Sequence, residues 1–333
     1  MHPVAGGPGK QSPTSSIGFE MKRAILVGID DYTHFKSLRG CVNDAKALHP
    51  LLARNEDDSV NFDCKTMLGT VTREKLFDGI VSLLAGGADF ALLYFAGHGL
   101  PVGDDVCLVT SDGQGNTPGV RFNEILEMVA GSEVGEIVVI LDCCFSGGAG
   151  TVTALSRRQV LLRNGLSLLT ASRGDQLSDE IAGRGVFSSY LEGALDGGAA
   201  DVLGHVTVAG LYAYLSESFG AWDQRPTFKA NVDRLHDLRR CNPSVPLETL
   251  RRLPLWFATP DETYRLDPSY EPDAEPKHPE HEAVFAQLQA CRANKLVEPD
   301  GHQHMYYAAM QSLGCRLTPL GRHYWQLAKR DRL

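Results

Sequence analysis

Four short apolar runs divide the first two thirds of the chain, and each ends at or beside Gly, Asp or Ser. They are RAILVGI, FALLYFA, EIVVILD and GLSLLTAS, at residues 23–29, 90–96, 136–142 and 165–172. Each is short and rich in leucine or β-branched residues, without a polar face. This pattern is typical of central strands that are covered on both sides in a parallel sheet.

Between these runs, apolar residues recur at helical spacing, which predicts amphipathic helices. The segments are NDAKALHPLLAR, TREKLFDGIVSLLA and FNEILEMVAG, at residues 43–54, 72–85 and 122–131. Strands and helices alternate in this way from Arg23 to about Phe228. The pattern therefore predicts the α/β class, with a parallel sheet flanked by helices, over about residues 21–235.

The C-terminal third has a different pattern. Eight of the seventeen prolines lie between Cys241 and Pro279, so residues 236–279 are interpreted as a Pro-rich linker that spans or wraps. Residues 280–333 contain about three amphipathic segments, which predicts a small helical domain. Thr318 is the expected N-cap of the last helix, because Pro319 suits the first helical position.

Composition excludes several classes of protein. With 43% hydrophobic residues in 333, the chain can bury a large core, and its net charge of -9 disfavours a main role in nucleic-acid binding. The eight cysteines show neither a disulfide framework nor a C-x-x-C metal pair, which suggests reduced thiols in a cytoplasm. Residues 1–20 resemble a flexible leader rather than a secretory signal, and no apolar stretch is long enough to cross a membrane.

Two of the predicted strands end in residues that can carry chemistry. The strand at 90–96 runs into GHG, and the strand at 136–142 runs into CCFSGG. In an open α/β sheet, ligands bind beyond the carboxyl ends of the strands, so His98 and Cys143 or Cys144 can face each other there. Alone, such a histidine or cysteine is more often structural. The separation of 46 residues from His98 to Cys144 is close to the roughly fifty expected of a caspase-type pair.

Over about residues 22–231 the chain resembles the caspase and metacaspase clan of cysteine peptidases. The matching motifs, in family order, are VGIDDY, LRGCVNDAKAL, LLYFAGHG, LDCCFSGG, LLTASRGDQLSDE and QRPTF. The resemblance implies a caspase-like, mostly parallel six-stranded sheet and an endopeptidase with Cys144 as nucleophile and His98 as acid and base. It also implies an oxyanion hole formed by the backbone N–H groups of Gly99 and Cys144.

The strand period independently supports Cys144 over its neighbour. Side chains alternate between the faces of a strand, so Asp142 and Cys144 share one face while Cys143 points to the other, into packing. Phe145 follows the nucleophile where many metacaspases have histidine.

The resemblance also implies a pocket for a basic substrate side chain, formed by Cys41, Asp44 and Asp142. Two carboxylates suit a guanidinium, so cleavage is expected after Arg and less well after Lys. Structural alternatives remain open for both acids. Asp44 lies in the first turn of a predicted helix, where an acid favours the helix dipole, and Asp142 could simply end its strand.

A latent state is expected of such a peptidase. Arg157, Arg158 and Arg163 lie where clan members are cut during activation, although an ordinary basic loop explains them equally well. Some prokaryotic relatives act in antiviral defence, including effectors linked to CRISPR peptidases, and this chain could be one of them. No metal or cofactor is expected; calcium, which many metacaspases need, would have Asp104, Asp105 and Asp112 as its nearest acids.

The C-terminal segment CRLTPLGRHYW looks similar to winged-helix units behind bacterial caspase-like domains. Seven Lys or Arg against five Asp or Glu in residues 280–333 make a weak case for DNA, so partner docking or autoinhibition is preferred. The expected partners are protein substrates with Arg or Lys before the cut bond, and an activating peptidase or regulator. Two alternatives stay open: a catalytically silent caspase-like adaptor, and a small-molecule thiol enzyme on a flavodoxin-like sheet.

Overall fold

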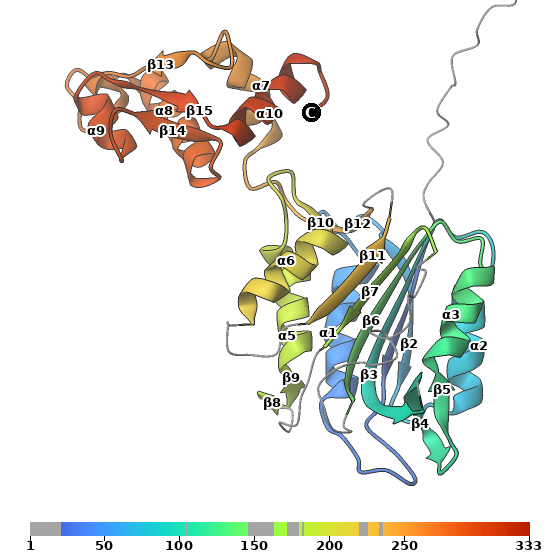
Figure 1. Cartoon of the computed structure of the whole chain (residues 1–333). Coiled ribbons are helices and arrows are strands. Elements are labelled where there is room, and N and C mark those ends of the chain that lie inside the picture. Colours follow the sequence, from blue (N-terminus) through green and yellow to red (C-terminus); the bar gives the residue numbers. More distant parts are fainter. Residues whose placement is uncertain are drawn as a thin grey trace, which may run out of the picture.

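The computed structural model describes residues 21–103, 105–145, 163–171, 180–181, 183–219, 226–232 and 236–333. The expected leader at residues 1–20 lies outside these ranges. Figure 1 shows a twisted sheet with helices on both faces, and a second group of elements formed by the C-terminal part of the chain.

A mostly parallel sheet forms the centre of the first group. Its six-strand path runs β11-β7-β6-β3-β1-β2, in which the last five strands are parallel and β11 is antiparallel to β7. The strands of this path are β1 (Lys22–Gly28), β2 (Phe62–Leu68), β3 (Phe90–Val102), β6 (Glu136–Phe145), β7 (Leu166–Thr170) and β11 (Thr227–Asn231). The predicted α/β class and parallel sheet are confirmed, and the four apolar runs coincide with β1, β3, β6 and β7.

The sheet is larger than the sequence pattern predicted, because β3 continues past its apolar run. Its last residues pair antiparallel with β4 (Asp105–Gln114), and β4 pairs with β5 (Thr117–Arg121). The described sheet therefore has eight strands. β3 and β6 also extend beyond the predicted strand ends, which places GHG and the residues DCCF within strands.

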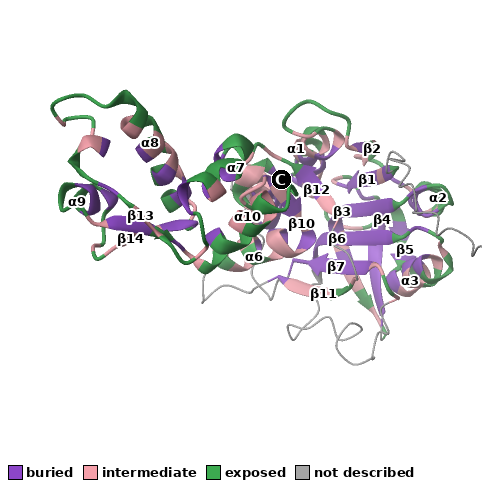
Figure 2. Cartoon of the chain, turned by 90° about the horizontal axis from the view of Figure 1, so that it is seen from above, coloured by how far each residue is buried: buried purple, intermediate pink, exposed green. Residues whose placement is uncertain are grey.

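Helices cover the sheet on two faces, as Figure 1 shows. One face carries α1 (Cys41–Ala53), α5 (Val186–Gly193) and α6 (Val208–Ser218), and the other carries α2 (Arg73–Leu83) and α3 (Phe122–Gly131). Alternate strand residues enter two separate apolar cores: Leu92 and Ile140 lie on the α1 face, Leu93 and Val139 on the α2 face. Figure 2 shows that the central strands β1, β3, β6 and β7 are largely buried, which explains their continuous apolar sequences, whereas the edge strands β2 and β11 are partly exposed.

Short elements complete this first unit. The two-residue strands β8 (Glu180–Ile181) and β9 (Arg184–Gly185) form an antiparallel pair directly before α5. The π-helical segment η1 (Ala194–Gly198) follows α5, and β10 (His205–Thr207) pairs with β12 (Asp237–Arg240).

The expected linker at residues 236–279 is wrong for most of its length. It contains α7 (Leu247–Trp256), β13 (Thr263–Arg265) and η2 (Pro268–Tyr270), and its apolar residues enter a third core. Leu250, Leu253 and Phe257 are fully buried in that core. The prolines of this segment do not prevent these elements from forming. Pro268 begins η2, where its missing N–H is tolerated, and α7 forms although Pro254 lies inside it.

The rest of the C-terminal unit contains the three expected helices together with a small sheet. The helices are α8 (Pro279–Ala293), α9 (Met305–Met310) and α10 (Pro319–Lys329). β14 (Val297–Asp300) and β13 both pair antiparallel with β15 (Gly314–Leu317). The Thr318 side chain accepts the Gly321 amide at 3.0 Å, which confirms the predicted N-cap. Across the described residues, no helix has the length and apolar character that a membrane span requires.

Candidate active site

The two candidate catalytic residues lie opposite each other on neighbouring strands. His98 of β3 is the register partner of Cys144 of β6, and Gly99 is the partner of Phe145. Because adjacent strands are about 5 Å apart, the two backbones are close at this level of the sheet. The position is the carboxyl end of both parallel strands, where the sequence placed the site. The Cys144 thiol itself lies outside the described part of the structure.

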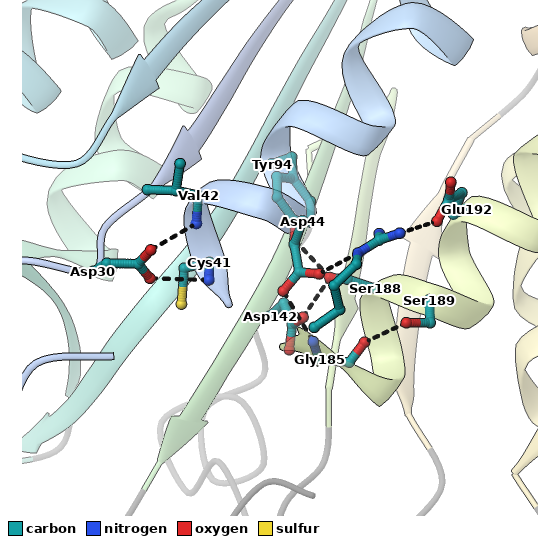
Figure 3. A network of polar contacts seen from close by, with 11 residues as sticks. Asp30, Cys41, Val42, Asp44, Tyr94, Asp142, Gly185, Ser188, Ser189 and Glu192 are labelled. Atoms are coloured by element: carbon teal, nitrogen blue, oxygen red, sulfur yellow. Dashed lines mark hydrogen bonds and ion pairs between the residues drawn. The ribbon is translucent and has the colours of Figure 1, made fainter. Parts of the chain in front are cut away.

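The neighbouring residues Asp142 and Cys143 face opposite sides of the sheet. Cys143 is 2% exposed and packs in the core on the α2 face, together with Leu141 and Val139. Asp142 points to the α1 face, where it lies close to Asp44 (Figure 3). The prediction that Cys143 is a packing residue is confirmed. Because β6 continues to Phe145, the alternative that Asp142 ends its strand is excluded.

His98 is held from two sides by residues of the loop after β1. Its backbone amide donates to the Tyr32 hydroxyl at 2.9 Å, and its imidazole Nε2 lies 2.7 Å from the Lys36 carbonyl oxygen. A carbonyl can only accept, so Nε2 carries a proton, and Nδ1 is the ring nitrogen that can accept one. Gly97 permits this arrangement, since a Cβ there would lie 2.7 Å from the Tyr32 hydroxyl.

Asp30 fixes the start of α1, and with it the acidic side of the site. Its carboxylate accepts the amides of Cys41 at 3.0 Å and Val42 at 3.4 Å, which are unpaired donors at the helix N-terminus. Gly28 lets the helix approach β1 closely, because a Cβ there would lie 2.3 Å from the Cys41 carbonyl oxygen. Burial and the nearby Asp30 raise the pKa of the Cys41 thiol, which therefore remains protonated.

Asp44 is buried in the first turn of α1, as expected, where an acid favours the helix dipole, but its carboxylate bonds to residues outside that helix. One carboxylate oxygen accepts the Gly185 amide and the other accepts Nε of Arg184, both at 3.1 Å. The pKa of Asp44 is raised to about 6, mainly by burial; nearby Asp142 also raises it, whereas the Gly185 amide and Arg184 lower it. Asp44 and Asp142, the two acids of the predicted pocket, thus interact electrostatically.

The Asp142 carboxylate lies at the end of a chain of two buried hydroxyl groups, those of Ser188 and Tyr94. It accepts a hydrogen bond from Ser188 of α5, and the Ser188 oxygen lies 2.6 Å from the Tyr94 hydroxyl. Since Ser188 gives its one proton to Asp142, Tyr94 must donate to Ser188. Burial raises the pKa of Tyr94 well above its usual value, which keeps that donor protonated. Three elements, β3, β6 and α5, therefore meet at Asp142.

The comparisons with known proteins agree with this geometry. A family model of the caspase domain, Peptidase C14, matches residues 21–235. The chain belongs to the caspase-domain family. It is 30% identical to metacaspase-7 of Arabidopsis thaliana over 144 residues, and 28% identical to metacaspase-8 of the same plant over 146 residues. Each match covers 38% of this chain and 35% or 37% of the relative, so the chain spans about a third of the length of these curated relatives.

Two of the three acids that the sequence offered for calcium, Asp105 and Asp112, have structural partners in the caspase domain. Asp105 accepts the amides of Val106 and Asn123, the latter in the first turn of α3. Asp112 accepts the Arg73 amide at the start of α2. Asp104 lies outside the described residues. Within the described ranges, no cluster of three or more His, Cys, Asp or Glu side chains is suited to a metal ion.

Of the three candidate processing sites, the structure describes Arg163. Its guanidinium donates to the carbonyl oxygens of Val129, Ser132 and Val134, at the end of α3. The side chain thus ties the segment before β7 to the end of α3 and the turn that follows it. Arg157 and Arg158 lie outside the described residues, and processing in this region stays a prediction.

Sequence reasoning missed several residues of the site. Asp30 and Tyr32 belong to the motif VGIDDY, to which no role was assigned beyond the resemblance. Ser188 and Arg184 lie in GRGVFSS, which directly precedes and enters α5 and was not singled out. An alternation of glycines around one arginine was the available signal, but its partner Asp44 is 140 positions earlier.

Proposed function

We propose that the chain is a cysteine endopeptidase that cleaves proteins after Arg, and less well after Lys, with a His98–Cys144 dyad. The observation that carries the proposal is the register pairing of His98 with Cys144 at the carboxyl ends of two parallel strands. Membership of the caspase-domain family supports the reaction class. The tautomer of His98, fixed by the Lys36 carbonyl, supports a proton-accepting role for Nδ1.

The reaction follows from the chemistry of these groups. His98 Nδ1 takes the Cys144 proton, and the thiolate attacks the carbonyl carbon of the scissile amide. The backbone N–H groups of Gly99 and Cys144 stabilise the resulting oxyanion. When the C–N bond breaks, His98 gives the proton to the leaving amine. A water molecule, deprotonated by His98, then hydrolyses the thioester and releases the acid product, and the proton returns to Cys144.

The preference for a basic side chain at P1, the residue before the cut bond, rests on Asp44 and Asp142. Asp44 of α1 and Asp142 of β6 lie close together on the α1 face of the sheet, and each raises the cost of ionising the other. A cation between them offsets that repulsion. A guanidinium forms several charge-assisted hydrogen bonds in fixed directions, whereas an ammonium is a compact point charge, so Arg is favoured over Lys.

We further propose that the enzyme is latent until it is cut or signalled, in a defence or cell-death role. Cleavage after Arg163 requires its guanidinium to leave three carbonyl groups, so Arg157 and Arg158 are the preferred processing positions. The partners are protein substrates and an activating peptidase or regulator, which acts through the C-terminal unit.

The test compares the native chain with Cys144→Ala on peptides that differ at P1 alone, with Arg, Lys or Asp. Cys143→Ala is the matched control, because the neighbouring cysteine is buried in the core. We expect cleavage in the order Arg, Lys, Asp by the native chain and Cys143→Ala, and none by Cys144→Ala. If the activity survives in Cys144→Ala, or never depends on it before or after a cut at Arg157 or Arg158, the protease proposal is wrong. A preference for Asp at P1 would contradict the assignment of Asp44 and Asp142 to the P1 pocket, but not the protease proposal.

A further inference from the structure

Asp44, one of the two acids of the predicted pocket, already contacts a guanidinium from the same chain. Arg184 of β9 donates from Nε to Asp44 of α1 at 3.1 Å and from Nη1 to Glu192 of α5. Its side chain is 23% exposed, while that of Asp44 is 3% exposed. Figure 3 shows Asp44, Asp142 and Ser188 in one network that continues through this contact to Glu192. A chain arginine thus occupies the carboxylate that the proposed function assigns to the substrate's arginine.

Local backbone geometry explains how Arg184 reaches this position. Gly183 has a φ of 77°, in the left-handed region that favours glycine, and turns the chain between β8 and β9. The backbone amide of Gly185, two residues after Gly183, donates to the second carboxylate oxygen of Asp44. The backbone of β9 and the side chain of Arg184 therefore approach the same carboxylate. Of the two contacts, a side-chain rotation removes that of Arg184 without disturbing that of Gly185.

The contact between Arg184 and Asp44 leaves hydrogen-bonding capacity unused. Arg184 contributes one nitrogen to Asp44, not the parallel pair that makes Arg–carboxylate contacts strong. Its Nη2 is buried and has no partner among the described residues. Burying a donor without an acceptor is unfavourable. The internal arginine is therefore held less well than a guanidinium that could use all of its donors.

We propose that Arg184 determines P1 specificity by competing with the substrate's basic side chain for the Asp44 carboxylate. The inference rests on the proposed function and goes beyond it, because it names a residue of this chain that weakens P1 binding. A substrate arginine binds Asp44 after it displaces Arg184 toward Glu192. The Glu192 side chain is 36% exposed, so it can keep the displaced guanidinium paired near solvent. A P1 lysine offers fewer directed bonds for the same displacement, so the competition favours Arg over Lys.

Arg184→Gln tests the competition directly, in the full-length chain. Assays are run at pH 8, because removing the guanidinium takes away an interaction that lowers the pKa of Asp44. We expect KM for P1-Arg peptides to fall about five- to twenty-fold, the effect of one charge-assisted contact, with kcat little changed. Calorimetric binding of acetyl-arginine amide to Cys144→Ala, with and without Arg184→Gln, measures the same change without turnover.

Three further variants separate competition from a merely structural contact. Glu192→Gln removes the carboxylate that keeps the displaced Arg184 paired but leaves Asp44 intact, so displacement becomes less favourable and we expect KM for P1-Arg peptides to rise. Arg73→Gln is the matched control, because it breaks another half-buried Arg–Glu pair, with Glu124, and its KM should equal that of the native chain. In an Asp44→Asn background, Arg184→Gln should no longer change KM. Thermal melts of all variants show which of them fold.

The outcomes distinguish this inference from the proposed function. Absence of Cys144-dependent cleavage and of acetyl-arginine amide binding in every variant would overturn both. Normal cleavage with KM unchanged or raised in folded Arg184→Gln, or with KM lowered in folded Glu192→Gln, would overturn the inference alone, and would make Arg184 a structural tie between α1 and α5. A decrease in KM that persists in the Asp44→Asn background would also contradict it.

Discussion

The hydroxyl of Tyr32 accepts the backbone amide of His98 at 2.9 Å and donates to the Ile29 carbonyl, while its ring lies 4.7 Å from the imidazole. Tyr32 thus joins the end of β1 to the histidine of β3. Tyr32→Phe removes both hydrogen bonds but keeps the ring. We expect kcat to fall about ten-fold with KM unchanged, and the free energy of unfolding to decrease by about 1–3 kcal/mol.

Peptide kinetics and urea denaturation check this prediction, and Tyr264→Phe is the control. That variant also removes one hydroxyl hydrogen bond, to Tyr270, but in the C-terminal unit. It should lose stability without losing kcat. Equal kcat in both variants and the native chain would show that Tyr32 does not position His98.

Asp44 is expected to make stability depend on pH below neutrality. Its pKa rises from 3.8 to about 6 in the folded chain, mainly through burial, so folding favours the protonated form. The contribution is therefore fully present below pH 3.8 and is lost as the pH rises through about 6. Since each pKa unit corresponds to about 1.4 kcal/mol, the loss is at most about 3 kcal/mol.

The measurement compares urea denaturation of the native chain and Asp44→Asn between pH 4 and 8. Other titrating groups affect both proteins, so the difference between the two curves isolates Asp44, together with its charged neighbours Asp142 and Arg184. The free energy of unfolding should decrease more steeply with rising pH in the native chain than in Asp44→Asn. Parallel curves would contradict the raised pKa. In peptide assays, KM for P1 Arg should rise as the pH falls below about 6.

Ser188 connects the two buried groups Asp142 and Tyr94. Removing its hydroxyl should therefore lower the free energy of unfolding by more than the loss of either hydrogen bond alone. Ser188→Ala deprives Asp142 of a hydrogen-bond donor and Tyr94 of its acceptor. We expect a loss of about 1–3 kcal/mol in the free energy of unfolding and a higher KM for P1-Arg peptides. Tyr94→Phe keeps the bond to Asp142, and should cost about 1 kcal/mol with KM unchanged. A smaller loss in Ser188→Ala than in Tyr94→Phe would disprove the donor order.

Much of the fold could be predicted because central parallel strands have a strong signal in the sequence. Leu92, Leu93 and Ile140 are apolar on both faces, since helices cover both faces of the sheet. β4 was missed because it follows β3 by a tight turn and contains Ser111, Asp112 and Gly113. No periodicity marks a strand that pairs with the extension of another strand.

The part of the site that is placed by the backbone of the sheet could be predicted from the sequence. His98 and Cys144 each end an apolar run, and parallel pairing brings such ends together whatever lies between. Arg184 could not be found in this way, because its role depends on a contact with a residue 140 positions away. The burial of Asp44, which gives the contact its significance, is likewise a property of the packed fold.

The segment interpreted as a linker supplies the last prediction, since α7 carries two leucines in opposite environments. Leu253 is fully buried in the C-terminal core, whereas Leu255 is 78% exposed. Leu253→Ala should lower the free energy of unfolding of this unit by about 2–5 kcal/mol, the cost of a cavity in a packed core, and Leu255→Ala by less than about 0.5 kcal/mol.

Cys291 and Cys315 report the change, because both are buried in the same core and are free thiols. Thiol-reagent labelling followed by peptide mapping should show faster modification of these two cysteines in Leu253→Ala alone, with Cys107 of the caspase domain unaffected. Equal labelling in the two variants would restore the interpretation of this segment as a linker.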